Sequence, residues 1–415
     1  MISGPVHGSP PRSGLLALVT LLVAVCSGCS NDNGIIARLD VKAGEFDRRD
    51  TVVTFDTFGE IKPGAYLMID KQGAETPVQI LANGKGIFIL RRLPAGESVQ
   101  FELKAGSPGA TRDRVTFEKA KGAVTFQIGT RSVLTYVAEK RHPPLPEIPP
   151  IYARGGYIHP VYTPSGVLVT DDYPPDHYHH HGIWSAWTNT QFEGRQPDFW
   201  NVRMRTGSVE PVGLDKLFDG VVAGGFRARH RYIDLTTGQP KPVLNEEWEV
   251  SIYNSLNDPP SKWIFDLVQR QECASSSELR LLQYRYGGVG FRGHRQWLGP
   301  ENTFFLTSEG KDRSNGHGTR ARWCEIAGPV DGRLAAVAVL GHPENEEFPE
   351  PMRINPIQPF FNFSPTAAGP SAIVPDKPRV TRYRFVVYDG RSDPAEIDRL
   401  WNDYAYPPAV QVTSG

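Results

Sequence analysis

Cysteine is scarce in this chain, with four residues in 415. Cys26 and Cys29 lie beside an apolar run near the N-terminus, which leaves Cys273 and Cys324 for the remainder. Neither belongs to a CxxC pair, so the sequence shows no thiolate metal site. The two can form a disulfide or remain small buried hydrophobic side chains, and the sequence leaves both alternatives open.

Net charge and long apolar runs are also lacking. Lys and Arg total 45 against 46 for Asp and Glu, so the formal charge is −1 and gives no electrostatic reason to expect nucleic-acid binding. Apolar runs are short, which excludes a protein built from several membrane-spanning helices. A glycine-rich phosphate loop, a G-x-S-x-G elbow, an H-E-x-x-H helix and internal repeats are missing as well. We therefore expect no nucleotide cofactor and no nucleic-acid partner.

The N-terminal segment has the pattern of an export signal. Arg12 precedes an apolar run at residues 15–25, which is followed by the sequence C-S-G-C. Small residues before Cys29 resemble a bacterial lipoprotein signal, and a plain secretory signal is the alternative. We predict a signal peptide at residues 1–28, lipidation at Cys29, and an exported lipoprotein anchored to a membrane in the periplasm or at the cell surface.

Glycine (41 residues) and proline (36 residues) are abundant and separate short runs rich in β-branched and aromatic side chains. Such runs, spaced by about 8–12 residues, predict an all-β protein. We expect a tether at residues 29–35, a small β-sandwich at 36–140, a proline-rich linker at 141–153 and a large antiparallel β-sandwich at 154–410. One short helix is expected near the C-terminus, where Asp393 can cap it and Ile397, Leu400 and Trp401 form an apolar stripe.

Residues 170–187 are the most distinctive part of the chain, with four of the eleven histidines, three carboxylates and two tryptophans. Pro174 and Pro175 remove backbone donors, so we predict a rigid loop that enters a strand after Gly182. In that strand Ile183 and Trp184 are expected to face opposite sides. Functional side chains are commonly carried by loops on a rigid scaffold. We interpret this loop as the functional site, and a solvated polar loop is the alternative.

The loop contains the sequence Asp-His-Tyr-His-His-His, which begins at Asp176. In an extended segment His177, His179 and His181 share one face. Two kinds of chemistry remain open: a divalent metal ion held at His177 and His179, or acid–base catalysis by His177, His179 and His180 with Asp176 fixing a tautomer. We favour acid–base catalysis because no second ligand cluster is near in sequence. His180→Ala is then expected to abolish turnover with little loss of stability.

Other polar and aromatic residues are candidates for substrate contacts. Arginine can clamp a carboxylate, indole rings stack on sugar rings, and side chains at strand ends often lie in binding loops. For each residue alone, a core or surface role is the alternative. The predicted substrate-binding residues are Arg154, His159, His181, Trp184, Trp200, Arg285, Arg292, His317, His342 and Asn345.

Several motifs together resemble the DUF6807, or PmoA-like, family of bacterial exported proteins. The resemblance covers about residues 60–390 and rests on G-Y-I-H-P-V-Y-T-P-S-G, D-H-Y-H-H-H-G-I-W, Phe199-Trp200, H-P-E-N from His342, and Y-R-F-V-V-Y-D-G from Tyr383. The family pattern D-H-x-H-H-R-G-L-W has arginine and leucine where this chain has His181 and Ile183. The resemblance implies a sandwich similar to galactose mutarotase-like proteins and an association with sugar-converting enzymes.

The sequence thus predicts an exported carbohydrate-active enzyme that acts on a sugar or oxidised glycoside by lyase, hydrolase or epimerase chemistry. A non-catalytic glycan-binding or scaffold lipoprotein, whose histidines pack or hold a structural metal, is the alternative. The expected partners are a carbohydrate or another small molecule and, through the lipid anchor only, a membrane.

Overall fold

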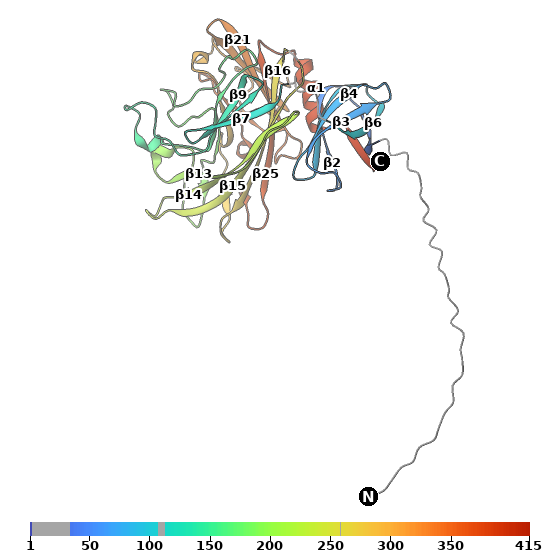
Figure 1. Ribbon diagram of the computed structural model, residues 1–415. Helices are drawn as coiled ribbons and strands as arrows, with labels where there is room; N and C mark the ends of the chain where they lie inside the picture. Colours follow the sequence, from blue (N-terminus) through green and yellow to red (C-terminus); the bar gives the residue numbers. More distant parts are fainter. Residues whose placement is uncertain (2–33, 107–112, 258) are drawn as a thin grey trace, which may run out of the picture. The chain divides into compact units, whose positions relative to one another are not determined.

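The computed structural model describes Met1 and residues 34–106, 113–257 and 259–415. The predicted signal peptide, Cys29 and most of the predicted tether lie outside the described residues. The described part forms antiparallel sheets and one α-helix near the C-terminus (Figure 1), so the predicted all-β fold with a short C-terminal helix is confirmed. None of its helices is both long and apolar enough to cross a bilayer.

The first sheet has seven strands in the order β2-β5-β4-β3-β6-β1-β26. Alternate residues of its strands, such as Leu39, Phe88 and Leu103, face a core of their own. Its last strand comes from the C-terminal segment and pairs antiparallel with β1. The strands are β1 (Ile35–Lys42), β2 (Arg48–Asp56), β3 (Gly64–Asp70), β4 (Glu75–Ile80), β5 (Lys85–Leu93), β6 (Ser98–Ala105) and β26 (Ala409–Ser414).

Two eight-stranded antiparallel sheets follow. The order of one is β22-β23-β18-β11-β10-β9-β8-β7, and that of the other is β13-β14-β15-β16-β25-β21-β20-β19. The strands of the former are β7 (Val115–Ala120), β8 (Ala123–Ile128), β9 (Arg131–Val137), β10 (Tyr157–Val161), β11 (Ile183–Ala186), β18 (Gly288–Arg292), β22 (Met352–Ile354) and β23 (Phe360–Phe363). Those of the latter are β13 (Gly207–Phe218), β14 (Ala223–Asp234), β15 (Lys241–Tyr253), β16 (Lys262–Cys273), β19 (Phe304–Thr307), β20 (Trp323–Val330), β21 (Arg333–Gly341) and β25 (Arg379–Asp389).

Side chains of both eight-stranded sheets form one core, so these sheets make a β-sandwich. Phe265 and Phe385, on neighbouring strands of one sheet, stack within this core with ring centroids 4.9 Å apart. Ile183 of the other sheet points into the same core, whereas the next residue, Trp184, belongs to a different apolar cluster. The alternation predicted for the strand after Gly182 is confirmed.

Three short elements complete the β-structure in a further sheet of order β12-β17-β24, formed by β12 (Thr190–Gln191), β17 (Leu279–Leu281) and β24 (Ser371–Ile373). Short 3₁₀ turns lie at η1 (Pro150–Tyr152), η2 (Val202–Met204), η3 (Arg295–Trp297) and η4 (Pro365–Ala367). The first of these falls in the predicted proline-rich linker. There Tyr152 packs edge-on against Tyr178, with ring centroids 5.5 Å apart, so this segment lies against the histidine-rich loop.

Sheet membership differs from the predicted domain boundary at residue 140. We expected residues 115–137 in the small N-terminal sandwich, but β7, β8 and β9 pair in sequence and β9 pairs with β10 of the large sandwich. Conversely, β26 joins the N-terminal sheet. An alternating apolar pattern identifies a strand with one buried face but does not specify its partner.

Helix α1 (Pro394–Ala405) begins as the sequence predicts. The Asp393 side chain accepts a hydrogen bond from the backbone N–H of Ala395, which caps the helix. Ile397, Leu400 and Trp401 are buried in an apolar cluster shared with β2, β5 and the second sandwich sheet. Cys273 and Cys324 are both free, and Cys324 is buried.

Candidate functional site

The histidine loop (residues 171–182) folds into two turns and not into an extended segment. The backbone N–H of His177 donates to the carbonyl of Pro174, and the N–H of His180 donates to the carbonyl of His177, each at 2.9 Å. The predicted shared face of His177, His179 and His181 is therefore wrong, because the two prolines favour a turn over an extended backbone. The turns instead gather three rings, with centroids 5.3 Å (His177–His179), 4.8 Å (His177–His180) and 4.7 Å (His179–His180) apart.

His181 anchors the end of the loop. Its Nδ1 lies 2.6 Å from Asp172, and Tyr157 donates its hydroxyl to the other oxygen of the same carboxylate at 2.8 Å. Burial lowers the pKa of His181, and Asp172 opposes that shift. Gly182 follows with φ +35°, and a Cβ there would lie 2.2 Å from the carbonyl of Ile158, so only glycine fits.

Asp176 forms a bidentate ion pair with Arg292. Its two oxygens accept hydrogen bonds from the guanidinium at 2.7 and 2.9 Å. Burial raises the pKa of Asp176, but the neighbouring His177 and the hydrogen bonds from Arg292 outweigh it and lower that pKa below the usual range. Arg292 is 1% exposed, so it holds the loop and is not free to clamp a substrate, as the sequence suggested.

A small pocket opens beside the three gathered histidines, which we call the histidine pocket. Its volume is about 130 Å³, below the range of about 300–1,000 Å³ typical of drug-sized ligands, so it suits one small ring. Imidazoles, aromatic rings, amides and arginines line it, and none of the described lining residues carries a carboxylate. The lining residues are His177, His179, His180, Trp200, Asn201, Arg285, Tyr286, Arg353, Asn355, Gln358 and Phe360.

A chain of hydrogen bonds sets the tautomer of His177. Backbone N–H groups of Ile357 and Gln358 donate to Asn355 Oδ1, each at 3.0 Å, so Asn355 presents its amide nitrogen to Gln358 Oε1 at 2.7 Å. Gln358 then presents Nε2 to His177 Nδ1 at 2.9 Å. An amide nitrogen only donates, so this contact favours the tautomer in which His177 Nδ1 accepts and Nε2 carries the proton. Asp176 also lies 3.2 Å from this Nδ1, a longer contact.

His179 and His180 are neutral imidazoles. Burial, and then the neighbouring His177 and His181, lower the pKa of His179 to about 3. Burial and the adjacent His179 and Arg292 hold the pKa of His180 well below its usual value. Among described residues, no group hydrogen-bonds the His179 ring, whereas His180 is packed between Trp184 and Phe360, with centroids 4.9 Å from each. His179 is thus available to a ligand, and His180 has a packing role that makes alanine costly.

Several predicted contact residues lie next to the pocket without lining it. Trp184 is fully buried beneath His180. His317 is exposed, and its Nε2 lies 3.4 Å from the Arg353 guanidinium. Arg154 is buried, donates to the carbonyl of Ser185 at 3.0 Å, and lines a separate cavity of about 110 Å³ with His179 and His181. His179 therefore borders both cavities.

Three other predicted residues are not brought to the pocket. The His159 ring is hydrogen-bonded to Thr170 at 2.9 Å, and His342 packs against Tyr404 of α1 with centroids 5.1 Å apart. Asn345 is buried and pairs with both backbone groups of Arg382, at 2.8 and 2.9 Å. Its amide also donates to Glu350 at 3.0 Å, so it ties a loop to β25.

Glu350 makes stability depend on pH. Burial raises its pKa from 4.5 to about 7, against hydrogen bonds from Asn345 and Tyr383. Between about pH 4.5 and 7 the folded protein binds a proton that the unfolded chain has lost, so stability falls as pH rises through this interval. Above about pH 7 the full loss in the free energy of unfolding, about 3 kcal/mol, is present.

Glu350→Gln is expected to remove this fall of stability with pH, as measured by urea unfolding, whereas Glu60→Gln, at an exposed position, should retain it. Equal pH profiles for both variants would contradict the assignment.

Another buried histidine, His230, belongs to the sandwich interior. His230 Nδ1 lies 2.7 Å from Glu246, and its Nε2 lies 2.8 Å from the Tyr136 hydroxyl. Gln269 and Gln271 donate to the other oxygen of Glu246 at 2.6 and 2.7 Å. Each partner is buried and paired, so this network satisfies polar groups in the core and offers nothing to a ligand.

Six of the eleven residues that line the histidine pocket were not predicted from the sequence. Asn201 and Tyr286 adjoin the predicted residues Trp200 and Arg285, which is the one signal that could have indicated them. Arg353, Asn355, Gln358 and Phe360 come from β22, β23 and the segment between them, and β23 pairs with β18, which pairs with β11. Long-range strand pairing is what brings these residues to the histidine loop.

Within residues 34–106, 113–257 and 259–415, no group of three or more His, Cys, Asp and Glu side chains is placed to hold a metal ion. A divalent cation at His177 and His179 has no third protein ligand of these types there. Metal binding at these two residues stays a prediction.

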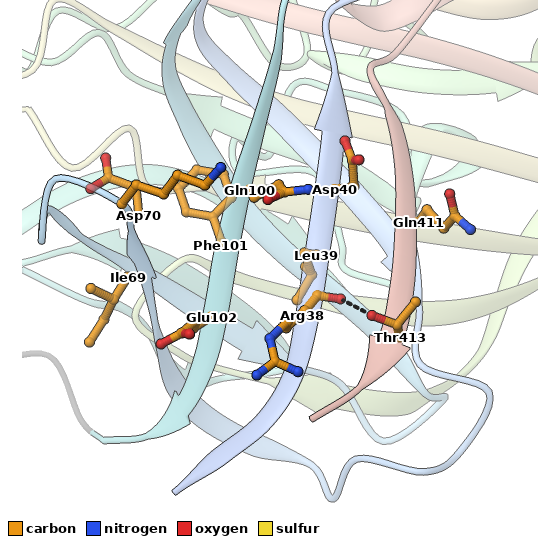
Figure 2. A pocket seen from close by; sticks show the side chains of 11 residues that line it. Arg38, Leu39, Asp40, Ile69, Asp70, Gln100, Phe101, Glu102, Gln411 and Thr413 are labelled. Atoms are coloured by element: carbon orange, nitrogen blue, oxygen red, sulfur yellow. Dashed lines mark hydrogen bonds between the residues drawn. The ribbon is translucent and has the colours of Figure 1, made fainter. Parts of the chain in front are cut away.

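A second hollow, of about 510 Å³, lies on the N-terminal sheet (Figure 2). Its lining mixes charges of both signs, including Arg38, Asp40 and Glu102 on neighbouring strands. The Thr413 hydroxyl donates to the carbonyl of Arg38 at 3.5 Å across β1 and β26. None of the described residues that line this hollow is a histidine.

Comparison with known proteins gives a family and distant structural likenesses. A family model described as a family of unknown function, DUF6807, matches residues 123–402. No curated protein matches the chain. Similar solved structures include a protein in glycosyl hydrolase family 38 from Enterococcus faecalis (7% identity, TM-score 0.45) and an alpha-mannosidase from Enterococcus faecalis V583 (8%, 0.42). Both matches cover 92% of this chain and about half of the other (48% and 46%), and at these scores they carry no argument about function.

Proposed function

Because the chain belongs to DUF6807, a family of unknown function, we propose its function from the histidine pocket alone: it is an enzyme that binds a small carbohydrate and moves a proton on it. The proposal rests on two imidazole rings, those of His177 and His179, which both line an aromatic pocket. Each ring presents a nitrogen to which no described residue forms a hydrogen bond. The resemblance seen in the sequence motifs is in accord with the family match.

The two imidazoles have complementary roles. His177 presents a proton on Nε2, since Gln358 occupies its Nδ1, and can donate a hydrogen bond to a substrate carbonyl. Burial keeps His179 neutral, so one ring nitrogen can accept a proton from carbon. Negative charge that develops on the substrate raises the basicity of His179 during this transfer. Trp200 and Tyr286 offer aromatic faces to the sugar ring.

The proposed proton transfer rearranges electron pairs within the substrate and needs no oxidant or reductant. His179 takes a proton from the carbon beside a carbonyl, and the C–H electron pair forms a C=C bond while the carbonyl oxygen becomes an oxyanion beside His177. If water protonates the opposite face and His179 releases its proton to solvent, the product is an epimer. If a leaving group departs from the next carbon with its electron pair and takes the proton from His179, the product is that of a lyase.

Hydrolysis by paired carboxylates is less well supported. Most glycosidases use two Asp or Glu side chains that flank the scissile bond. The histidine pocket has no carboxylate in its lining. Of the three reaction types that the sequence left open, we therefore favour lyase or epimerase chemistry.

Solvent deuterium exchange tests this proposal. We expect the full chain, incubated in D₂O with aldonic and uronic acids and 3-keto glycosides, to place deuterium on the carbon beside the carbonyl of one substrate, detected by NMR. Exchange is expected to persist after treatment with EDTA. A lyase product is recognised by its new C=C bond. Release of a saturated product without deuterium would instead indicate hydrolysis, and sugar binding with neither product nor exchange would favour the alternative, a non-catalytic glycan-binding protein.

A further inference from the structure

Two arginines of the histidine pocket have no acidic partner. Arg285 is exposed and precedes β18, and Arg353 is half-buried in β22. Among the described residues neither forms an ion pair. Arg353 Nη1 contacts the carbonyl of Ile354 and the His317 ring, both at 3.4 Å, and Arg285 lies 5.9 Å from the centroid of the Tyr286 ring.

These two positive charges are close enough to affect each other. Burial, and then the charge of Arg285, lower the pKa of Arg353. Holding like charges together beside a partly desolvated pocket is unfavourable unless an anion joins them. Arginine is the side chain best suited to that task, since its planar fork matches a carboxylate.

Nearby carboxylates are already engaged. Both oxygens of Asp176 are held by Arg292. Asp198 accepts hydrogen bonds from the Asn201 amide at 2.8 Å and from Thr188 at 3.1 Å, behind the pocket wall. The lining itself contains arginine, imidazole, amide and aromatic groups only. The pocket is therefore positive, and the described protein supplies it with no counter-ion.

We propose that the histidine pocket takes a sugar acid, whose carboxylate lies between Arg285 and Arg353 while its ring rests against Tyr286 and Trp200. This inference rests on the proposed function and names its substrate class. The proposed proton transfer also explains why a carboxylate is favoured over another anion. In a uronic acid the C–H bond next to the carboxylate is the one that a base attacks, and its electron pair then spreads onto the carboxylate as a second negative charge, which the arginines stabilise.

Calorimetric titration of the full chain tests the substrate class. D-glucuronate is expected to bind, and D-glucuronamide, its neutral isostere, to bind at least about tenfold more weakly. Arg285→Met and Arg353→Met are each expected to weaken glucuronate binding about ten- to hundredfold, because a hydrogen bond to a charged group is lost. Each substitution should weaken binding of the amide less than binding of glucuronate. Arg92→Met, an exposed arginine on β5, is the matched control and should leave all affinities unchanged.

Specific outcomes would overturn the inference. Equal affinity for the acid and the amide, no binding of either, or unchanged acid binding in both pocket variants would each do so. Tighter binding of D-glucose 6-phosphate than of glucuronate would show that the pocket prefers a phosphate to a carboxylate. Circular dichroism and melting curves confirm that the variants fold.

Failure of this inference can be told apart from failure of the proposed function. Arginine-dependent binding of glucuronate without deuterium exchange retains the ligand class and removes the catalysis. Deuterium exchange on a neutral sugar, at a rate unchanged by Arg285→Met and Arg353→Met, retains the catalysis and removes the sugar acid.

Discussion

Replacing His177 with alanine is expected to lower turnover by about 10²–10⁴-fold, the usual contribution of one positioned acid or base. The ring lines the pocket, and Gln358 holds its Nδ1 so that Nε2 carries the proton toward the substrate. Its side chain is 36% exposed, so its removal leaves no large cavity, and stability should change by less than about 1 kcal/mol. Turnover per folded molecule and the urea midpoint measure the two effects.

A matched control separates chemistry from general damage. His142 is exposed in the proline-rich segment, and His142→Ala should leave turnover unchanged. Added imidazole should partly restore turnover to His177→Ala, since it can occupy the vacated space, but not to a variant that has lost its fold. Full activity in His177→Ala, or a large loss of stability that accounts for its lower activity, would remove His177 from the catalytic groups.

Replacing Asp176 with asparagine is expected to cost about 3–5 kcal/mol of stability, because it leaves the Arg292 guanidinium buried without its carboxylate. Arg292 is 1% exposed, whereas the Asp176 side chain is 25% exposed. Arg292→Met removes the buried charge and leaves a carboxylate that water can reach, so it should cost less. Unfolding in urea at pH 7 measures both variants.

The double variant decides whether the ion pair itself is responsible. Asp176→Asn with Arg292→Met should be more stable than Asp176→Asn alone, because the unpaired buried charge is gone. The asparagine variant should also lose activity, since the turn that carries His177 and His179 depends on this contact. Two results would show that the ion pair does not hold the loop. One is a loss of stability below about 1 kcal/mol in Asp176→Asn, and the other is a double variant whose loss of stability equals the sum of the two single losses.

The sequence was informative where the signal is local. Proline and glycine positions predicted a loop that leads into β11, and alternation predicted that Ile183 and Trp184 face different clusters. The cap at Asp393 and the apolar stripe of α1 were equally readable. Each of these features depends on residues within a few positions of one another, where backbone preference and side-chain periodicity act directly.

Features that depend on distant strands could not be predicted. Arg285 and Arg292 looked equivalent in the sequence, yet one is exposed in the pocket and the other is buried against Asp176. Their difference arises because β18 pairs with β11 and places the end of β18 beside the histidine loop. Nothing in the local pattern around Arg353 or Gln358 indicates that β22, β23 and their connection reach the same place.

One measurement tests the central claim most directly: a crystal of the protein soaked with D-glucuronate. We expect the sugar ring beside Trp200 and Tyr286, an oxygen within hydrogen-bond distance of Nε2 of His177, and the carboxylate between Arg285 and Arg353. An ordered ligand found only on the N-terminal sheet (Figure 2), or His177 and His179 bonded to protein groups alone with the sugar elsewhere, would contradict the assignment of this pocket as the functional site.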